Sequence, residues 1–358
     1  MSTTPQSERA AWLLPRGLLI LLGIGSAVLA IAGMRAAADV VGPVFLALVL
    51  TIAVHPVHGY AQRRQWPAWT GTLLGVVLTY LILIGLCAVL LLAVARFASL
   101  VPQYQDDLAS LLKGGANKLK DMGVGQQQVD DFVGSFDPRV LIEFAGDILA
   151  GLLAVVSNLF FIVPLLLFLC ADAAQFTNKL NDVRAHREAV VTSLESFAHG
   201  TRRYLVVSTV FGFGVAVLDT VFLVFTPIPA PLLWGLLAFI TNYIPNIGFV
   251  IGMAPPAILG LLVGGPELMV LVVVVYSGLN IAIQSVIQPK FVGDAVGLSP
   301  TITFVSLLFW AWVLGAVGAL FAVPLTLLVK ATLVDVDRDQ GWLGQMLAGG
   351  AAPKKSSD

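Results

Sequence analysis

The chain has 358 residues, of which 58% are hydrophobic and 11% are charged, and its net charge at pH 7 is −1. Soluble domains carry about 25% charged residues. The 110 residues from Thr220 to Val329 contain only three charges, so their helices have no polar face for water. This composition excludes a water-soluble domain and predicts an all-α, polytopic membrane protein. There is no basic stripe with interleaved aromatic residues, so nucleic acid is not an expected partner.

Four apolar runs in the first half of the chain are each long enough to cross a bilayer, which takes about 20 residues. The first run follows Arg9 and Arg16 and ends in three alanines, as a signal peptide would. Its 18 residues exceed a usual signal core, so an uncleaved span is favoured. The four predicted spans are residues 17–34, 36–54, 68–95 and 148–171.

Two charged stretches separate these runs from the second half. Residues 97–147 hold eight acidic and four basic residues, with apolar residues at helical spacing, and predict a small extramembrane helical segment. Residues 172–203 are also charged, with apolar residues recurring at roughly helical spacing. A surface or interfacial helix is expected there.

The second half combines two continuous apolar runs with two broken ones. Residues 204–226 and 268–288 predict the fifth and sixth spans. Residues 231–263 and 300–330 each have two arms of about 15 residues around a proline or glycine break, and such short arms predict re-entrant hairpins. The expected fold has about six full spans plus two Pro/Gly-broken hairpins. It divides into N-terminal membrane helices (1–96), the extramembrane segment (97–147), a core (148–335) and a tail (336–358).

Lysine and arginine predict the sidedness, because cytoplasmic loops carry an excess of these residues. With a cytoplasmic N-terminus, 14 of the 20 basic residues face the cytoplasm, and four of the other six lie in residues 97–147. The C-terminal tail is then cytoplasmic, and the two hairpins enter from opposite sides. Treating the hairpins as double spans gives the same sidedness, so charge does not separate the two topologies.

The two breaks supply candidate binding residues for a carrier. Proline frees backbone carbonyls near it, and irregular backbone inside a membrane survives only within protein or beside a water-filled cavity. Paired broken segments point to the site of a transporter. At the first break, a structural turn capped by its own asparagines is an equally good interpretation. The candidates are Asn242, Pro245, Asn246, Gly248, Gly315 and Gly318.

Three amides in the sixth span extend this set. Asn280, Gln284 and Gln288 are spaced by four residues and therefore share one helix face. They predict either the polar wall of a solute pathway or hydrogen bonds between helices. The hydroxyl residues of the second hairpin expected to face them are Thr301, Thr303 and Ser306.

Asp219 is the only acidic residue well inside a predicted span. An ionised carboxylate at the bilayer centre costs roughly 2.5–3.5 kcal/mol on insertion scales, so it needs a polar partner or a proton. Asp219 is therefore a candidate for ion coupling. The alternative is an interfacial residue, because the span ends seven residues later at Thr226. Asp39, four residues after Arg35, is expected to form a local ion pair at the membrane edge.

Enzyme signatures are absent from the sequence. It contains no His-Glu-x-x-His, no Gly-x-Ser-x-Gly and no phosphate-binding Gly-Lys-Ser/Thr motif. Cys87 and Cys170 lie in apolar runs and are expected to be buried thiols. The chain is therefore not expected to be an enzyme or to bind a cofactor or metal.

The residues around the two breaks form a recognisable pattern. The first set is Pro231, Gly235, Asn242, Ile244, Pro245, Ile247, Gly248, Pro255 and Pro256; the second is Gln284, Pro289, Gly293, Val296, Leu298, Pro300, Gly315, Gly318 and Pro324. Together they resemble the autoinducer-2 exporter family of bacterial membrane proteins. The resemblance covers nearly the whole chain, although the first half matches only in layout. The chain departs from the family pattern at Asn246, Phe249 and Ser299, where an aromatic residue, a proline and a histidine are usual.

The resemblance implies a multispanning carrier of the bacterial inner membrane. Some members resemble exporters of a small polar quorum-sensing signal, others are linked to sodium–proton antiport, and oligomers are expected. The preferred hypothesis is a secondary transporter that exports an autoinducer-2-like solute by alternating access. The alternatives are a cation–proton antiporter, and a passive channel or structural scaffold. The expected partners are a small polar solute or monovalent cation, the lipid bilayer and further copies of the chain.

Overall fold

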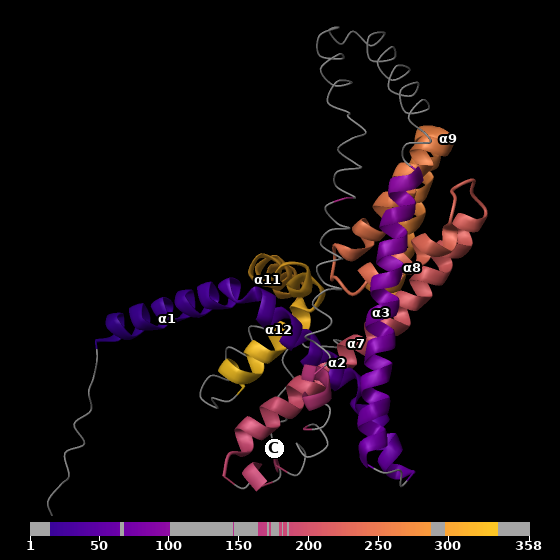
Figure 1. The fold of residues 1–358 in the computed structure, drawn as a ribbon. Helices are drawn as coiled ribbons and strands as arrows, with labels where there is room; N and C mark the ends of the chain where they lie inside the picture. The colour runs from indigo at the N-terminus through magenta and orange to yellow at the C-terminus, as the bar shows by residue number, and fades with distance from the viewer. Residues whose placement is uncertain are drawn as a thin grey trace, which may run out of the picture.

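The computed structural model describes residues 15–64, 68–100, 164–169, 186–287 and 298–335, with a few isolated positions between 146 and 184. These residues form helices joined by short turns, with no strand among them, which confirms the all-α class. The long helices are α1 Arg16–Ala36, α2 Ala38–Arg63, α3 Ala68–Leu100, α7 Glu188–Val224, α9 Gly248–Asn280 and α11 Pro300–Leu320, and two shorter ones are α8 Pro231–Thr241 and α12 Ala322–Val329 (Figure 1).

The membrane character of the fold is confirmed, whereas the predicted number of six spans stays a prediction. Four described helices are long and apolar enough to cross a membrane, or five if the bent pair α1–α2 is one span. Most of the predicted fourth span (148–171) lies outside the described residues. The same holds for most of the extramembrane segment (97–147) and for the tail (336–358).

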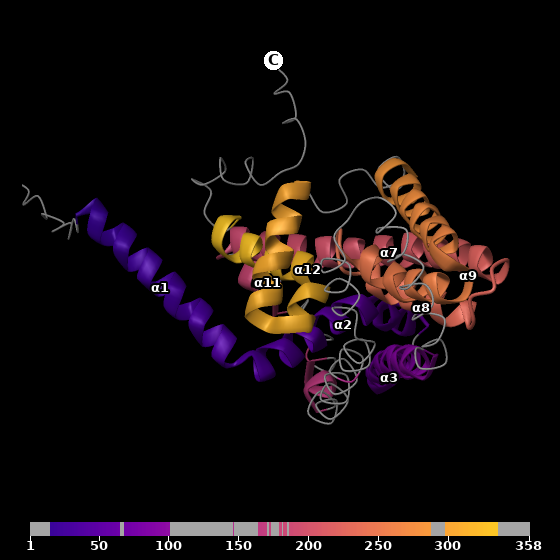
Figure 2. The same cartoon turned by 90° about the horizontal axis from the view of Figure 1, so that it is seen from above.

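α1 and α2 meet at a sharp bend. Their axes differ by 88° at Ala37, and α1 projects away from the other helices in both views (Figures 1 and 2). The sequence predicted two spans here; by length and composition the bent pair forms one broken span or a re-entrant loop. Arg35, expected to pair with Asp39, instead lies with its guanidinium carbon 4.4 Å from the ring centre of Trp312 in α11. This cation–π contact ties α1 to the second hairpin.

α7 is a single helix of 37 residues. From Glu188 onward it replaces the separate surface helix and fifth span that the sequence predicted. Residues 188–224 contain no proline, so nothing interrupts the hydrogen-bond ladder between the charged and uncharged parts. At 1.5 Å per residue the helix is about 55 Å long, far beyond a hydrocarbon core of about 30 Å. Its charged beginning therefore extends past the apolar layer.

The first predicted hairpin (231–263) is present as α8, a turn at residues 242–247 and the first part of α9. Its two arms lie so close together that only glycine fits between them, because a Cβ added at Gly248 would lie 1.8 Å from the carbonyl oxygen of Thr241. α9 loses helical geometry at Gly265, where φ is 74° and ψ is −171°. The helix after this break corresponds to the predicted sixth span.

The second predicted hairpin (300–330) is formed by α11 and α12. Helical geometry stops at Gly315, where φ is 65° and ψ is −142°. The chain then returns, so that Trp310 Nε1 donates a 3.0 Å hydrogen bond to Thr326 Oγ1. A Cβ added at Gly318 would lie 1.9 Å from the carbonyl oxygen of Trp310. Helical geometry is therefore interrupted at both predicted breaks, whereas the re-entrant topology of the two hairpins stays a prediction.

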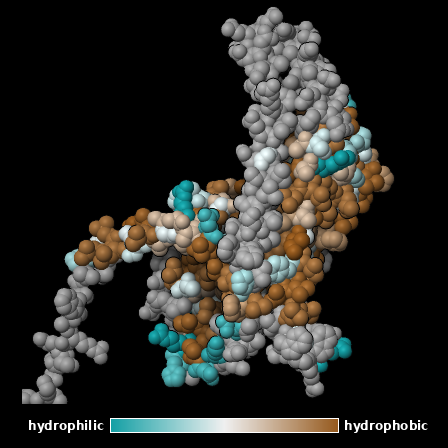
Figure 3. Space-filling model, viewed as in Figure 1, coloured by the Kyte–Doolittle hydropathy of each residue, from teal (hydrophilic) through white to brown (hydrophobic). Residues whose placement is uncertain are grey.

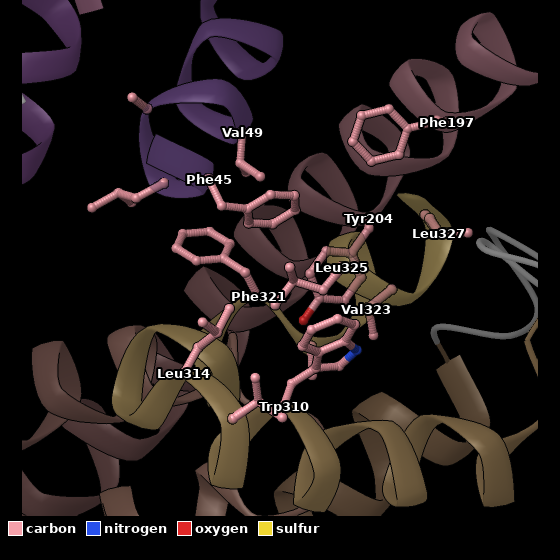
Figure 4. Packing of buried hydrophobic residues seen from close by; sticks show 14 of the residues in the cluster. Phe45, Val49, Phe197, Tyr204, Trp310, Leu314, Phe321, Val323, Leu325 and Leu327 are labelled. Atoms are coloured by element: carbon pink, nitrogen blue, oxygen red, sulfur yellow. The ribbon is translucent and has the colours of Figure 1, made fainter. Parts of the chain in front are cut away.

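Two buried apolar clusters position the hairpins. The α2–α12 core joins α2, α7, α11 and α12, and its residues include Phe45, Val49, Phe197, Trp310, Leu314, Phe321 and Leu325 (Figure 4). The α3–α9 core joins α3, α7, α8 and α9, and its residues include Ala93, Leu223, Trp234, Leu259, Val272 and Tyr276. The surface in view carries broad apolar areas (Figure 3), which suits contact with lipid.

Candidate functional site

A polar cavity lies where the tip of the first hairpin meets three other elements. These are α7, the π-helical segment Ile281–Ile287 after α9, and the first turn of α11. The cavity volume is about 260 Å³, close to the lower end of small-ligand sites, roughly 300–1,000 Å³. None of its described lining residues carries a charge. They are Tyr204, Ser208, Asn242, Pro245, Asn246, Gln284, Leu298, Pro300 and Thr303.

A chain of amide hydrogen bonds joins the hairpin tip to α9. Gln284 Nε2 donates to Asn242 Oδ1 at 2.6 Å and to Asn280 Oδ1 at 3.0 Å. Asn280 Nδ2 donates to the backbone oxygen of Tyr276 at 2.9 Å, and Asn242 Nδ2 donates to the backbone oxygen of Ser208 at 3.4 Å. One network therefore connects the tip, α7 and α9, and such networks fix the relative positions of their members.

Two tyrosines hold the tip against α7. The Tyr204 hydroxyl donates to the backbone oxygen of Tyr243 at 2.6 Å, and the Tyr243 hydroxyl lies 2.6 Å from Thr209 Oγ1. Asn246, three residues further along the turn, is exposed and has a φ of 62°. Asparagine tolerates this left-handed conformation better than most residues. The tip is thus anchored at Tyr243 and presents Asn246 at the cavity.

Two helices begin beside the cavity. α9 starts at Gly248, directly after the tip, and α11 starts at Pro300. Ser299 caps α11, because its side chain accepts a hydrogen bond from the backbone nitrogen of Ile302. Helix N-termini carry partial positive charge and unpaired N–H groups. Two helix N-termini therefore begin beside a cavity whose described lining residues carry no charge.

Asp219 lies apart from the cavity, in the last third of α7. Its side chain is 0% exposed, and neither carboxylate oxygen has a hydrogen-bond partner among the described residues. It is 11 residues from Ser208, about 16 Å along the helix. Asp219 and the cavity form two separate polar sites on one helix.

The structure brings together part of the predicted site. Asn242, Pro245, Asn246 and Gln284 line the cavity, and Asn280 bonds Gln284 from behind. Gly248 permits the tight crossing of the hairpin arms and does not line the cavity.

The other predicted residues lie elsewhere. Thr301 is exposed and absent from the lining, whereas Thr303, on a different face of α11, lines it. Gly315 lies 15 residues after Pro300, about 22 Å along the helix. Val317, between the two glycines, packs against α2 at Gly42. The predicted meeting of the two breaks at one cavity therefore finds no support in this geometry. Gln288 lies outside the described residues.

Sequence reasoning missed the α7 side of the cavity. Tyr204 and Ser208 are four residues apart and so share a helix face. That spacing was visible in the sequence, but Tyr204 was placed at the very start of a span. The tip of the first hairpin, folded back onto α7, is what gives these two residues a role.

An all-α membrane fold with broken hairpins around a polar cavity defines a polytopic membrane transport protein. Residues 24–337 match the family described as AI-2E family transporter. The chain belongs to this family, as the residues around the two breaks indicated.

The relatives support the same class. The AI-2 transport protein TqsA of Escherichia coli K12 is 28% identical over 317 residues, covering 88% of this chain and 92% of the relative. A Haemophilus influenzae protein named "Putative transport protein" is 30% identical over 325 residues, covering 87% and 91%. The E. coli K12 protein YhhT, with the same descriptive name, is 28% identical over 327 residues. These bacterial relatives and the apolar helices identify a bacterial inner-membrane transport protein.

Proposed function

We propose that the protein is a secondary transporter that exports a small polar solute, autoinducer-2-like in size and polarity, by alternating access. The observation that carries the proposal is the uncharged cavity lined by Asn242, Asn246 and Gln284. Amides and hydroxyls both donate and accept hydrogen bonds, so they match the hydroxyl groups of a polar, uncharged solute. The name of the E. coli relative, AI-2 transport protein, favours the same solute class.

The two helix starts add to this chemistry. The N-termini of α9 and α11 favour electron-rich groups, such as hydroxyl and carbonyl oxygens. The described lining offers no carboxylate to attract a cation and no ammonium or guanidinium to bind an acid. A neutral, oxygen-rich solute satisfies the helix N-termini and the amides together.

The cavity is built at a junction that relative motion would open. Its walls come from the first hairpin and α7 on one side and from the start of α11 on the other. Alternating access in carriers proceeds by rocking of one bundle against another around a fixed site. Here the tip of the first hairpin would move relative to the first turn of α11, which would open or close the cavity between them.

The test is solute flux in proteoliposomes, with autoinducer-2 as the probe. Gln284→Leu and Asn246→Gly should each lower the initial rate at least about tenfold, which corresponds to about 1.4 kcal/mol of lost transition-state stabilisation. Gly keeps the left-handed backbone at position 246 and removes only the amide. Gly214→Ala on α7 is the matched control, because its added Cβ meets nothing within 4 Å. Unchanged flux in both site variants would refute the assignment.

A cation–proton antiporter is the second candidate, and the observation that favours it is the buried, unpartnered carboxylate of Asp219. Asp219→Asn keeps the shape and removes the charge. An antiporter would lose sodium–proton exchange in this variant and would show no flux of autoinducer-2. A passive channel is distinguished by the absence of accumulation against a gradient, and a scaffold by the absence of any flux.

We further propose that both termini are cytoplasmic, that residues 97–147 are periplasmic, and that the protein assembles as a homo-oligomer. The excess of basic residues in the predicted cytoplasmic loops supports this topology. Cysteines introduced at Gln103 and Gln127 should react with an impermeant thiol reagent in intact spheroplasts. Labelling restricted to inverted vesicles would reverse the topology. Chemical cross-linking in native membranes tests the oligomer.

A further inference from the structure

Two buried polar groups in the α3–α9 core lack hydrogen-bond partners. Asp219 of α7 is 0% exposed and Tyr276 of α9 is 1% exposed. Neither Asp219 oxygen nor the Tyr276 hydroxyl has a partner among the described residues. An unpaired buried polar group costs about 1–3 kcal/mol, and more when it is charged. Two such groups in one place indicate a role beyond packing.

The two groups belong to the same packed interface between α7 and α9. Phe222 is one turn after Asp219 on the same face of α7, and its ring is edge-on to the Tyr276 ring at a centroid distance of 6.4 Å. Tyr276 is also within range of electrostatic interaction with Asp219. The carboxyl and the phenol therefore share one enclosed region between α7 and α9.

The third wall of this region is α8. A Cβ added at Gly235 would lie 2.9 Å from the backbone oxygen of Ala216 and 1.8 Å from Thr220 Oγ1, on the turns around Asp219. α8 carries no ionisable side chain. Most of the other titratable groups on the packed helices are exposed: Glu188, Glu195, His199 and Arg203 of α7, Glu267 of α9 and Arg96 of α3. The rest are half-buried, as are Arg202 and Tyr80, or lie in the α2–α12 core, as do Tyr204 and Cys87.

We propose that Asp219 and Tyr276 form a proton-binding site that drives the transport cycle. This rests on the proposed function as a secondary transporter. Asp219 carboxylate takes a proton from a hydronium ion and becomes a neutral carboxylic acid, releasing water. The neutral acid suits an apolar enclosure, where the carboxylate would be poorly stabilised. Release of the proton requires α7 and α9 to part and admit water.

The enclosure suits a proton better than sodium. Sodium sites in carriers draw on carbonyl oxygens of unwound helices. α7 is unbroken around Asp219, so its carbonyls remain in helical hydrogen bonds, and the Ala216 oxygen also accepts from Thr220 Oγ1 at 2.7 Å. One carboxylate and one phenol are too few oxygen ligands for a metal cation.

α9 provides the mechanical link to the cavity. Tyr276, Asn280 and Gln284 follow each other at four-residue spacing, and Asn280 Nδ2 bonds the Tyr276 backbone oxygen. Gln284 then bonds Asn242 at the hairpin tip. A movement of α9 away from ionised Asp219 would therefore displace Gln284 at the cavity. Tyr276 is a positioning residue in this scheme, and Asp219 binds the proton.

Infrared difference spectroscopy tests the site without any solute. The full chain in lipid nanodiscs, with a heavy-carbon label on aspartate carboxyls, is recorded through steps of pH. A label-sensitive carboxylic-acid band should persist at neutral pH, disappear in Asp219→Asn and shift in Tyr276→Phe. The shift keeps the test valid if Asp219→Asn fails to fold. Absence of the band at neutral pH overturns the proposal, as does its loss when sodium is added at constant pH.

Flux measurements separate this proposal from the proposed function. Asp219→Asn should lose accumulation of autoinducer-2 driven by a pH gradient, by at least about tenfold, whereas the control Gly214→Ala should accumulate it as wild type does. A wild-type protein that shows the infrared band and moves no solute would refute the transporter function and leave the proton site standing. If the Asp219→Asn variant still transports solute in proportion to the pH gradient, the proton site alone is refuted.

Discussion

The two hairpins have the same sequence pattern and different chemistry at their tips. Each has short apolar arms, a proline or glycine break, and a glycine at the closest approach of its arms. The tip of the first hairpin, residues 242–247, is polar and lines the cavity. The second turns between Gly315 and Phe321 with apolar side chains that pack into the α2–α12 core.

This difference separates what makes a hairpin from what makes a site. Short arms and a break are required wherever backbone folds back inside a membrane. They therefore identify both hairpins and say nothing about binding. Binding needs polar side chains that remain accessible after the tip has packed. Only the first tip has them among the described residues, because Tyr204 and Thr209 anchor Tyr243 and leave Asn246 free at the cavity.

The largest expected effect is common to both hairpins. Gly248→Ala and Gly318→Ala each place a Cβ less than 2 Å from a backbone oxygen, at 1.8 Å and 1.9 Å. Backbone does not move aside easily, so the cost should exceed the about 1–3 kcal/mol of ordinary overpacking. Both variants should lose the monodisperse size-exclusion peak. Gly278→Ala, with nothing within 4 Å of its Cβ, should elute as wild type.

The second expected effect differs between the hairpins: replacing a polar side chain should lower flux in the first and stability in the second. Asn242→Leu removes the bonds to Gln284 and Ser208 and should lower autoinducer-2 flux at least about tenfold. Its melting temperature should change little, because Gln284 Nε2 keeps its bond to Asn280 and borders the cavity, where water replaces the lost acceptor. Thr326→Val removes the acceptor of Trp310 in the second hairpin. A buried donor left unpaired costs about 1–3 kcal/mol. This variant should therefore melt earlier and transport normally per folded molecule. Equal loss of flux in both would place the second hairpin in the solute pathway.

The sequence predicted the fold well where the signal was backbone chemistry. Pro245 and Gly315 located the breaks, and of the two amides Asn280 and Gln284 only Gln284 lines the cavity. The predicted boundary within α7 failed because charge changes along a helix without interrupting its hydrogen bonds. The role of Tyr204 and the absence of Gly315 from the cavity depend on how distant segments pack. No local pattern contains that information.

The third effect concerns backbone strain at the two breaks. Gly315 has a φ of 65° with a ψ of −142°, a conformation open essentially to glycine alone. Gly315→Ala should therefore lose about 1–3 kcal/mol of stability, although its Cβ meets nothing within 4 Å. Asn246→Gly should change stability by less than about 0.5 kcal/mol, since both residues accept positive φ. Thermal melts of the two variants in the same detergent measure the difference. Equal melting temperatures would mean that the second break does not constrain its hairpin.

The smallest effect concerns the helices that support the tips. A Cβ at Gly212 of α7 would lie 2.5 Å from Asn242 Nδ2, whereas a Cβ at Gly42 of α2 would lie 3.7 Å from Val317 in ordinary contact. Gly212→Ala should push the Asn242 amide aside and weaken its bond to Gln284. We expect a fall in flux of about three- to fivefold, which corresponds to roughly 0.6–1 kcal/mol in activation free energy. The effect is small because the amide, at the end of a flexible side chain, can rotate away from the added Cβ. Gly42→Ala should leave flux unchanged, since the second tip binds no solute. A loss of flux in Gly42→Ala that equals the loss in Gly212→Ala would remove the distinction between the two tips.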